Sequence, residues 1–283
     1  MDVSVITVTW NSKAVIGEQV RSVQVGCKTS SFEQIVVDNA SSDGTGEYLS
    51  SEFPEIKLIQ NRKNSGFASA NNAAAKNARG EFILFLNPDM VVSPGSLDVI
   101  VDWMRNHKEV GIAGCLLVTS NGQPHPDAQP RRFPGLKDQL AVMLKIKKCF
   151  RGALDHYLFR DFNPHREQVV DTVRGSFMLM RREVYTKLGH AFDPRYYIWF
   201  EDVDLCRAVW RLGYTVVHTP IISCLDRLGL SFRQRDSFWK HRQFTQSLVT
   251  YFRKWEPARI WLPLWLARLV SLPPAWLYSL VKK

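Results

Sequence analysis

Cysteine is scarce in this sequence, and its arrangement argues against a metal or disulfide framework. The five cysteines are widely spaced, odd in number and without a C-x-x-C pair. Neither a zinc-binding module nor a disulfide-stapled secreted fold is therefore expected. The apolar run at residues 3–10 begins without the basic stretch and small-residue cleavage site of a signal peptide. We expect a chain that is not exported by that route and that meets a reducing cytosol.

The glycine motifs that bind phosphate in many nucleotide enzymes are also absent. No G-x-G-x-x-G follows the first apolar run, and no G-K-[ST] loop occurs. This argues against a dinucleotide-dependent oxidoreductase and against a P-loop enzyme. Recognition-helix and RNA-binding signatures are missing as well, so nucleic acid is not an expected partner despite the net charge of +10.

Acidic residues are few in two segments that hold the excess positive charge. Residues 131–153 carry seven cations against one acid, which gives +6, and residues 251–283 carry six against one, which gives +5. Both segments interleave cations with apolar residues, the pattern of a segment that lies on an anionic lipid surface. The charge distribution therefore predicts peripheral association with the cytoplasmic face of the inner or plasma membrane.

The C-terminal tail at 255–283 contains the longest apolar run. Residues 260–281 are almost uncharged, and their length is close to what a membrane span needs. Arg268 lies in the middle of this run, which is also interrupted by Pro263, Pro273 and Pro274. One or two interfacial helices with tryptophans at headgroup level are therefore expected rather than a span. A helix packed on the protein's own core is the alternative.

Apolar runs and helical stretches alternate through the first 106 residues. The expected strands are residues 3–10, 34–37, 56–59 and 82–86; the expected helices are residues 11–26, a stretch capped by Ser42-Asp43, residues 67–78, and a stretch capped by Ser93-Pro94 that ends at Asn106. This order is typical of a doubly wound α/β sheet, in which ligands bind outside the carboxyl ends of the strands.

Polar side chains follow several of these strands. Asp38, Asn64 and Asp89 each come shortly after a strand, so they are expected to converge on one edge of the sheet. Each has a local alternative, because Asp and Asn are also common turn and cap residues.

Three carboxylates directly follow a run of aromatic residues. Glu201, Asp202 and Asp204 open a predicted helix, and they are preceded by Tyr196, Tyr197, Trp199 and Phe200. Helix capping accounts for one acid in a first turn but poorly for three. An aromatic, sugar-stacking and partly desolvated surface would instead raise the pKa of a carboxylate toward that of a general base.

Six motifs along the chain together resemble one family. They are VITVTWN at 5–11, VDNASSDGT at 37–45, NSGFASANN at 64–72, LNPD at 86–89, RGS at 174–176 and FEDVDL at 200–205. In this order and spacing they resemble the family 2 inverting glycosyltransferases with a GT-A fold, and more narrowly their bacterial rhamnosyltransferase branch. The resemblance covers residues 1–255.

The resemblance implies an α/β architecture and a division of the chain. A GT-A type nucleotide-binding sheet with helices on both faces would occupy residues 1–254, and the C-terminal amphipathic helical segment would follow at 255–283. Within the first part, residues 1–118 would bind the nucleotide sugar and 119–254 would carry the acceptor and catalytic residues.

It also implies roles for individual residues. Asp202 would be the catalytic base, and Glu201 would fix that base or hold the acceptor. The implied donor-binding residues are Thr7, Trp10, Asp38, Asn64, Asn72 and Asn87, and the implied acceptor-binding residues are Arg174, Gly175 and Trp199. Asp89 would bind Mg²⁺ or Mn²⁺ on the donor diphosphate, for which hard oxygen ligands are suited.

Two positions depart from the family pattern. Asn87 replaces the first carboxylate of the usual Asp-x-Asp, and Asp226 stands where relatives carry the histidine of a His-x-x-Gly-x-Ser segment. Asp226 is the expected second metal ligand, and His218, on a predicted strand eight residues earlier, is its rival.

The expected activity is metal-dependent inverting transfer of L-rhamnose from dTDP-L-rhamnose to a lipid-linked glycan on a polyprenyl diphosphate. A transferase that uses another nucleotide sugar, such as a UDP-sugar, is one alternative. A non-catalytic module that binds membranes or glycans is another; it would not need Asp38, Asp89 and Asp202 together.

Overall fold

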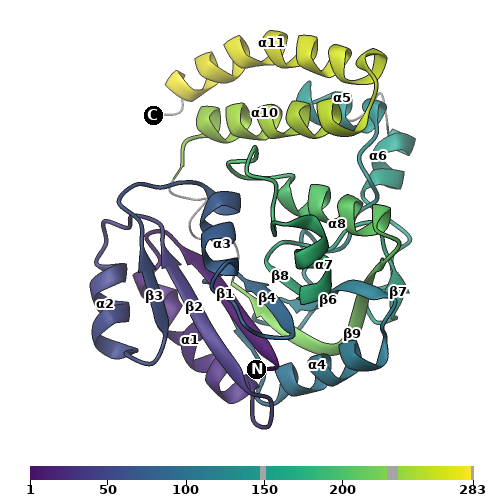
Figure 1. Ribbon diagram of the computed structural model, residues 1–283. Helices are drawn as coiled ribbons and strands as arrows, with labels where there is room; N and C mark the ends of the chain where they lie inside the picture. The colour runs from purple at the N-terminus through teal and green to yellow at the C-terminus, as the bar shows by residue number, and fades with distance from the viewer. Residues whose placement is uncertain (147–150, 228–234, 282–283) are drawn as a thin grey trace.

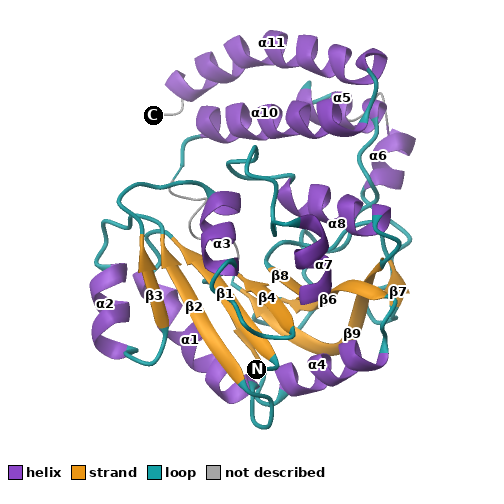
Figure 2. Cartoon of the chain, in the orientation of Figure 1, coloured by secondary structure: helices purple, strands orange, loops and turns teal. Residues whose placement is uncertain are grey.

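A computed structural model describes residues 1–146, 151–227 and 235–281. The helices are α1 Lys13–Gly26, α2 Thr45–Glu52, α3 Phe67–Ala75, α4 Ser96–Asn106, α5 Leu136–Met143, α6 Arg151–Tyr157, α7 Arg182–Leu188, α8 Glu201–Arg211, α10 Ser237–Trp255 and α11 Ala258–Val281. The strands are β1 Val3–Thr9, β2 Phe32–Asp38, β3 Lys57–Gln60, β4 Phe82–Leu86, β5 Met90–Val92, β6 Val110–Val118, β7 Gln168–Val169, β8 Phe177–Arg181 and β9 Thr215–Asp226. Figures 1 and 2 show their arrangement.

One sheet contains all nine of these strands. Its order is β3-β2-β1-β4-β8-β6-β9-β5, and β7 pairs with β9. Strands β3, β2, β1 and β4 are parallel, whereas β8 is antiparallel to both β4 and β6. The N-terminal half is thus the predicted parallel α/β sheet, and a mixed half extends it beyond β4.

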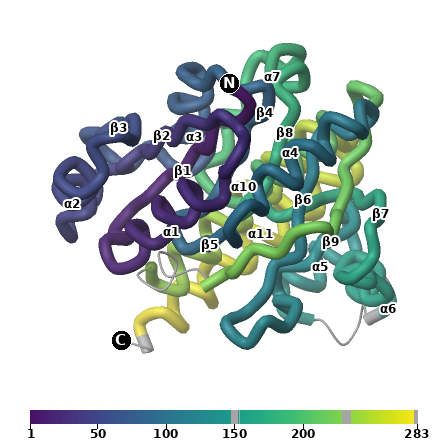
Figure 3. Tube along the Cα trace, turned by 90° about the horizontal axis from the view of Figure 1, so that it is seen from below, coloured from purple at the N-terminus to yellow at the C-terminus, as the bar shows by residue number. Residues whose placement is uncertain are grey.

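Helices cover both faces of the sheet, as predicted. The alternation of side chains along β1 shows why, since Val5 belongs to a core cluster that includes residues of α1 and α4, whereas Ile6 belongs to another that includes residues of α3 and α8. Both side chains are buried. Seen from below in Figure 3, α1 and α4 lie across the near face of the sheet.

Several predicted helix starts differ from the structure. Helix α4 does not begin at Ser93-Pro94: its N-cap is Gly95, in the left-handed region at φ 74°. Ser93 instead closes a turn, because its carbonyl oxygen accepts from the backbone N–H of Ser96 at 3.1 Å. Helix α2 likewise follows Gly44, and the Asp43 carboxylate accepts from the N–H of Thr45 at 3.0 Å. The left-handed glycine sets both starts.

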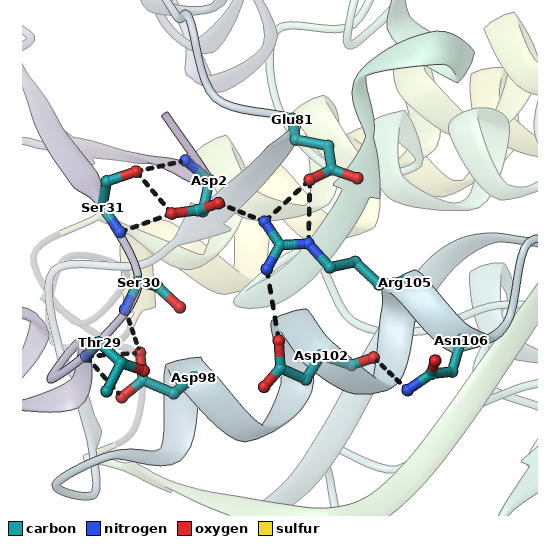
Figure 4. Close-up of polar contacts among 9 residues, drawn as sticks. All are labelled: Asp2, Thr29, Ser30, Ser31, Glu81, Asp98, Asp102, Arg105 and Asn106. Carbon is teal, nitrogen blue, oxygen red and sulfur yellow. Dashed lines mark hydrogen bonds and ion pairs between the residues drawn. The ribbon is translucent and has the colours of Figure 1, made fainter.

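The amino ends of β1 and β2 are tied to α4 by a charged cluster, drawn in Figure 4. Arg105 donates to Glu81 at 3.0 Å, to Asp102 at 3.3 Å and also to Asp2. Hydrogen bonds from the Ser31 side chain and backbone, together with Arg105, lower the pKa of Asp2 to about 2. These groups lie at the end of the sheet opposite the carboxyl ends of the parallel strands, so their role is structural.

Helices α10 and α11 form a layer above the sheet, together with α5 (Figure 1). Lys254 of α10 fastens this layer, because its ammonium group donates to Asp193 at 2.9 Å and to Asp204 at 2.7 Å. Helix α11 is one continuous helix that includes its three prolines. It is long and apolar enough to cross a bilayer by length and composition.

Some predictions concern residues beyond those described. Lys147, Lys148, Lys282 and Lys283 of the basic segments, and Gly229 and Ser231 of the segment after Asp226, lie outside the described residues.

Candidate active site

A cavity of about 300 Å³ opens at the carboxyl ends of the parallel strands. Residues from nine separate segments of the chain line it, including Trp10 after β1, Asp89 after β4, Asp202 at the start of α8, Asp226 at the end of β9 and Trp239 at the start of α10. This is the edge at which α/β sheets bind ligands.

The structure brings most of the predicted site residues together. Those that line the cavity are Trp10, Asn64, Asn87, Asp89, Arg174, Gly175, Trp199, Glu201, Asp202 and Asp226. Those that do not line it are Thr7, Asp38, Asn72 and His218.

The residues outside the cavity lining have local partners. Thr7 is buried and accepts from the Gln19 side chain at 3.0 Å, and Asp38 accepts from the N–H of Ser41 at 3.1 Å. Asn72 accepts from the N–H of Ala191 at 3.0 Å, which joins α3 to the segment before α8. Donor binding by Thr7, Asp38 and Asn72 therefore stays a prediction, and a structural role for Asn72 is what its contacts show.

Asp202 is held in one orientation by two backbone N–H groups. Gly175 donates to its Oδ2 at 3.1 Å, and Val203 donates to its Oδ1 at 2.8 Å. A Cβ on Gly175 would lie 3.3 Å from the Cβ of Asp202, so a side chain there would press on the carboxylate. Trp199 and Phe200, at φ 65° and 67°, turn the chain into α8 just before the acids. Such left-handed backbone outside glycine is costly, and it is common at functional sites.

The other two acids of this helix have different environments. Glu201 is buried, and its Oε2 has no hydrogen-bond partner among the described residues. Burial, and then the charge of Asp202, raise the pKa of Glu201 well above its usual range, so its neutral form is favoured. Asp204, by contrast, has two hydrogen-bond donors: its carboxylate accepts from Lys254 at 2.7 Å and from Trp255 at 2.6 Å. The three carboxylates therefore differ in their surroundings: Asp202 lines the cavity, Glu201 is buried with an unpaired oxygen, and Asp204 is paired with Lys254 and Trp255.

The predicted aromatic surface exists only in part. Tyr196 and Phe200 are buried in the core, so stacking of a sugar on these two residues was a wrong prediction. Tyr197 and Trp199 do line the cavity, and each ring centroid lies 6.1 Å from that of Trp239, which the sequence reasoning missed. Helix α10 thus completes the aromatic wall.

A network of amides joins the N-terminal half of the sheet to the segment before α8. Asn64 Oδ1 accepts from Asn39 at 3.1 Å and from the Tyr197 hydroxyl at 2.9 Å, while Asn39 Oδ1 accepts from Asn61 at 2.9 Å. Asn39 lines the cavity too, and its position inside the DNASSDG motif was the signal that could have identified it.

Other lining residues carry no local sequence signal. Thr9 and His125 are buried, and the Thr9 Oγ1 and His125 Nε2 atoms have no hydrogen-bond partner among the described residues.

Arg174 of the RGS motif lines the cavity and donates to the carbonyl oxygen of Asp127 at 2.7 Å. Burial, and then the charge of Arg131, lower the pKa of the Arg174 guanidinium, while Asp202 and Asp226 act in the opposite direction. Arg174 thus brings a positive charge close to the carboxylates of the site.

Asp89 and Asp226 are the two carboxylates suited to a cation. Strands β5 and β9 are antiparallel with Met90 opposite Asp226, and the Arg227 N–H donates to the Asp89 carbonyl oxygen at 3.2 Å, so the two residues are near neighbours. Two hard oxygen ligands fit Mg²⁺ or Mn²⁺ when phosphates and water complete the shell. No cluster of three or more His, Cys, Asp or Glu suited to a metal exists within the described ranges.

His218, the rival ligand, lies apart from this pair. It sits on β9 as predicted, but its Nε2 bonds to the carbonyl oxygen of Pro164 at 2.9 Å and its ring packs edge-on against Phe162. Burial lowers its pKa. Its surroundings give it a structural role.

Gly66 allows the close approach between α3 and the segment before α8. Its φ is 86°, and a Cβ there would lie 2.6 Å from the carbonyl oxygen of Tyr197, which accepts from the N–H of Phe67 at 2.7 Å. Gly122 has a similar φ of 72° but no atom within 4 Å of an added Cβ. Gly66→Ala is expected to lower the free energy of unfolding by roughly 1–3 kcal/mol more than Gly122→Ala, measured by urea denaturation. Equal losses would show that backbone strain alone, not the contact with Tyr197, constrains this position.

The family comparison agrees with this geometry. Residues 4–189 match the model of the family described as Glycosyl transferase family 2. The chain belongs to this family, and the resemblance stated from the motifs is confirmed.

Two similar curated proteins are rhamnosyltransferases by name. The N-acetylglucosaminyl-diphospho-decaprenol L-rhamnosyltransferase of Mycobacterium tuberculosis is 26% identical over 211 residues, which cover 66% of this chain and 63% of that protein. Rhamnosyltransferase WbbL of Escherichia coli is 29% identical over 163 residues, covering 55% of this chain and 58% of WbbL. The matched regions thus span somewhat less than two thirds of these relatives.

The fold also has solved counterparts. The mannosyltransferase PcManGT of Pyrobaculum calidifontis, solved in complex with GDP-Man and Mn²⁺, has a TM-score of 0.60 at 21% identity, covering 96% of this chain and 72% of its own. At this identity the likeness concerns the fold, and it confirms the predicted GT-A class. The chain therefore belongs to glycosyl transferase family 2 and has a GT-A-like fold.

Proposed function

We propose that this glycosyltransferase catalyses metal-dependent, inverting transfer of L-rhamnose from dTDP-L-rhamnose to a hydroxyl of a glycan carried on a polyprenyl diphosphate, in the assembly of a cell-surface polysaccharide. The observation that carries the proposal is the single cavity that holds both Asp202, fixed by Gly175, and the carboxylate pair Asp89 and Asp226. Such a cavity would place a general base and a cation site side by side.

The chemistry assigns each part of this cavity a task. As the acceptor oxygen bonds to the anomeric carbon, the bond to the donor diphosphate breaks and its electron pair leaves with the nucleoside diphosphate. Asp202 accepts the proton of the acceptor hydroxyl, and attack opposite the leaving group inverts the anomeric centre. Asp89 and Asp226 would hold the divalent cation, which neutralises charge on the diphosphate. Arg174 adds a positive charge at the same cavity.

The choice of donor and acceptor rests on the named relatives. The N-acetylglucosaminyl-diphospho-decaprenol L-rhamnosyltransferase and a second rhamnosyltransferase are both similar over more than half of this chain. The Mn²⁺ in the mannosyltransferase complex supports a divalent cation. Neither relative is matched over its full length, so the donor sugar and the lipid-linked acceptor belong to the proposal.

The test is a calorimetric titration of the purified protein with dTDP, UDP, GDP and CDP, each with and without Mn²⁺. We expect dTDP to bind most tightly and to bind more tightly with Mn²⁺, because Asp89 and Asp226 would hold a cation that would neutralise the charge of the diphosphate. If UDP bound most tightly instead, the donor would be a UDP-sugar and not dTDP-L-rhamnose. Failure of every nucleotide to bind would support a non-catalytic module that binds membranes or glycans.

A further inference from the structure

The large hydrophobic side chains exposed on this protein gather in one place. Among the described residues seventeen such side chains are exposed, and nine of them lie on α11: Leu262, Trp265, Leu266, Leu269, Val270, Trp276, Leu277, Tyr278 and Leu280. Two more, Leu144 and Ile146, follow α5, which packs against α11. We call these eleven residues the α11 face. A concentration of this kind marks an interaction surface.

Helix α11 has a protein-facing side as well, which fixes its orientation. Leu264 and Ala267 are buried. One turn further along the helix, the Ser271 hydroxyl bonds to His241 Nε2 on α10 at 2.9 Å. The exposed positions 262, 266, 269, 276 and 280 recur at helical spacing on the opposite side. Helix α11 is therefore apolar on both sides, with one apolar side packed on α10 and the other exposed to solvent.

The charges of α11 point to the nature of its partner. Helix α11 contains no Asp or Glu, and its mid-helix cation, Arg268, has a buried Nε. Exposed cations border the α11 face: Lys145 lies 5.5 Å from the ring centroid of Tyr278, Arg253 lies 5.2 Å from that of Trp261, and Arg259 is in the first turn. Apolar and aromatic side chains with cations at their border complement an anionic lipid surface. Two copies of the same face would instead bring like charges together.

We propose that the α11 face docks this protein on an anionic membrane, with α11 lying flat in the headgroup layer and still packed on α10. Lying flat, the helix would present a length of roughly 36 Å to the bilayer. A membrane span would require α11 to leave α10, and it would place Arg268 in hydrocarbon, which is costly. The packed arrangement keeps Arg268 on the protein.

Docking in this orientation also determines how far the cavity lies from the membrane. Trp239 in the first turn of α10 lines the cavity, and His241, one half-turn on, contacts α11. Packed helices lie about 8–10 Å apart, so the cavity would be separated from the membrane by roughly one helix layer. This position of the cavity matters only if the proposed function holds, because it would let a glycan on a membrane-bound polyprenyl diphosphate reach Asp202. The docking of α11 on the membrane does not depend on the proposed function.

The test is co-sedimentation of the full chain with lipid vesicles. Vesicles of phosphatidylcholine and phosphatidylglycerol, at about 70:30, should bind the protein at least about tenfold more strongly than phosphatidylcholine alone. The double variant Leu266→Glu/Leu269→Glu should lose about tenfold or more of this binding. The matched control Val99→Glu/Val169→Glu changes two exposed hydrophobic residues elsewhere and should bind as the unchanged protein does.

Further readouts separate the rival outcomes. Release of bound protein by alkaline carbonate supports the flat position, whereas resistance to it would show a span and overturn the proposal. Equal binding by the α11 variant and the control would also overturn it. A dimer in sedimentation velocity that the Leu266→Glu/Leu269→Glu change dissociates, without vesicle binding, would assign the α11 face to a second copy. Nucleotide titration of each variant shows whether the active site is intact, so failed docking and failed catalysis are distinguished.

Discussion

Asp202→Asn is expected to lower kcat by about 10²- to 10⁴-fold while the nucleotide diphosphate still binds. The variant keeps the shape of the side chain but removes its ability to accept the acceptor proton. The amide oxygen can still accept from the Gly175 N–H at 3.1 Å, whereas the bond from the Val203 N–H at 2.8 Å is lost because the amide NH₂ group cannot accept it. The loss is confined to one N–H in the first turn of α8, a place where backbone N–H groups have no partner within the helix, so the fold should persist. The measurements are sugar transfer to the acceptor and calorimetric nucleotide affinity. Lost nucleotide affinity in this variant would count against a role restricted to the base.

Glu201→Gln is the matched control for this prediction. Burial and the neighbouring Asp202 raise the pKa of Glu201, which favours the neutral form, and glutamine has the charge and nearly the shape of that form. We expect kcat to fall by no more than about tenfold, because no proton acceptor is lost. If both variants lost activity equally, the two acids would be acting as one coupled unit, and the assignment of the base to Asp202 alone would be wrong.

The parallel half of the fold was predictable because local pattern and tertiary structure agree there. Runs such as residues 3–10 and 82–86 are apolar throughout, as strands buried on both faces must be. The mixed half was not predicted, since the pairing of β8 with β4 and of β9 with β6 joins segments far apart in the sequence. Helix α4 shows a local failure: Ser93-Pro94 satisfies the capping rule, yet the left-handed Gly95 sets the start.

The candidate site was predictable where a side chain follows a strand and faces outward. This rule located Asn64 and Asp89, which line the cavity. Asp38 follows the same rule but bonds to Ser41 in its own turn, the local alternative that the turn chemistry had left open. His125 and Trp239 come from a loop and from a later helix, so only the three-dimensional packing reveals them. The sequence therefore predicts site residues at the ends of strands well, and it predicts poorly those that reach the site through long-range packing of loops and helices.

Asp89→Asn and Asp226→Asn are each expected to weaken Mn²⁺-dependent nucleotide binding by about 10²- to 10³-fold. Each removes one full negative charge from beside the cation, and such a charge at about 4 Å contributes on the order of 4 kcal/mol at an effective dielectric constant of 20. Asn87 supplies an amide where a second carboxylate is usual, so no nearby acid in that loop can compensate. The quantity to measure is the ratio of nucleotide affinities with and without Mn²⁺.

His218→Gln supplies the control, because it removes the rival ligand instead. The His218 ring bonds to Pro164 and packs on Phe162, so this change is expected to lower the melting temperature. The ratio of nucleotide affinities with and without Mn²⁺ should stay as in the unchanged protein. In Asp226→Asn the ratio should approach one with little change in melting temperature, since Asp226 ends β9 at the cavity. The reverse result, a Mn²⁺ ratio that falls in His218→Gln and persists in Asp226→Asn, would place the cation on the histidine side of β9 and overturn the assignment to Asp89 and Asp226.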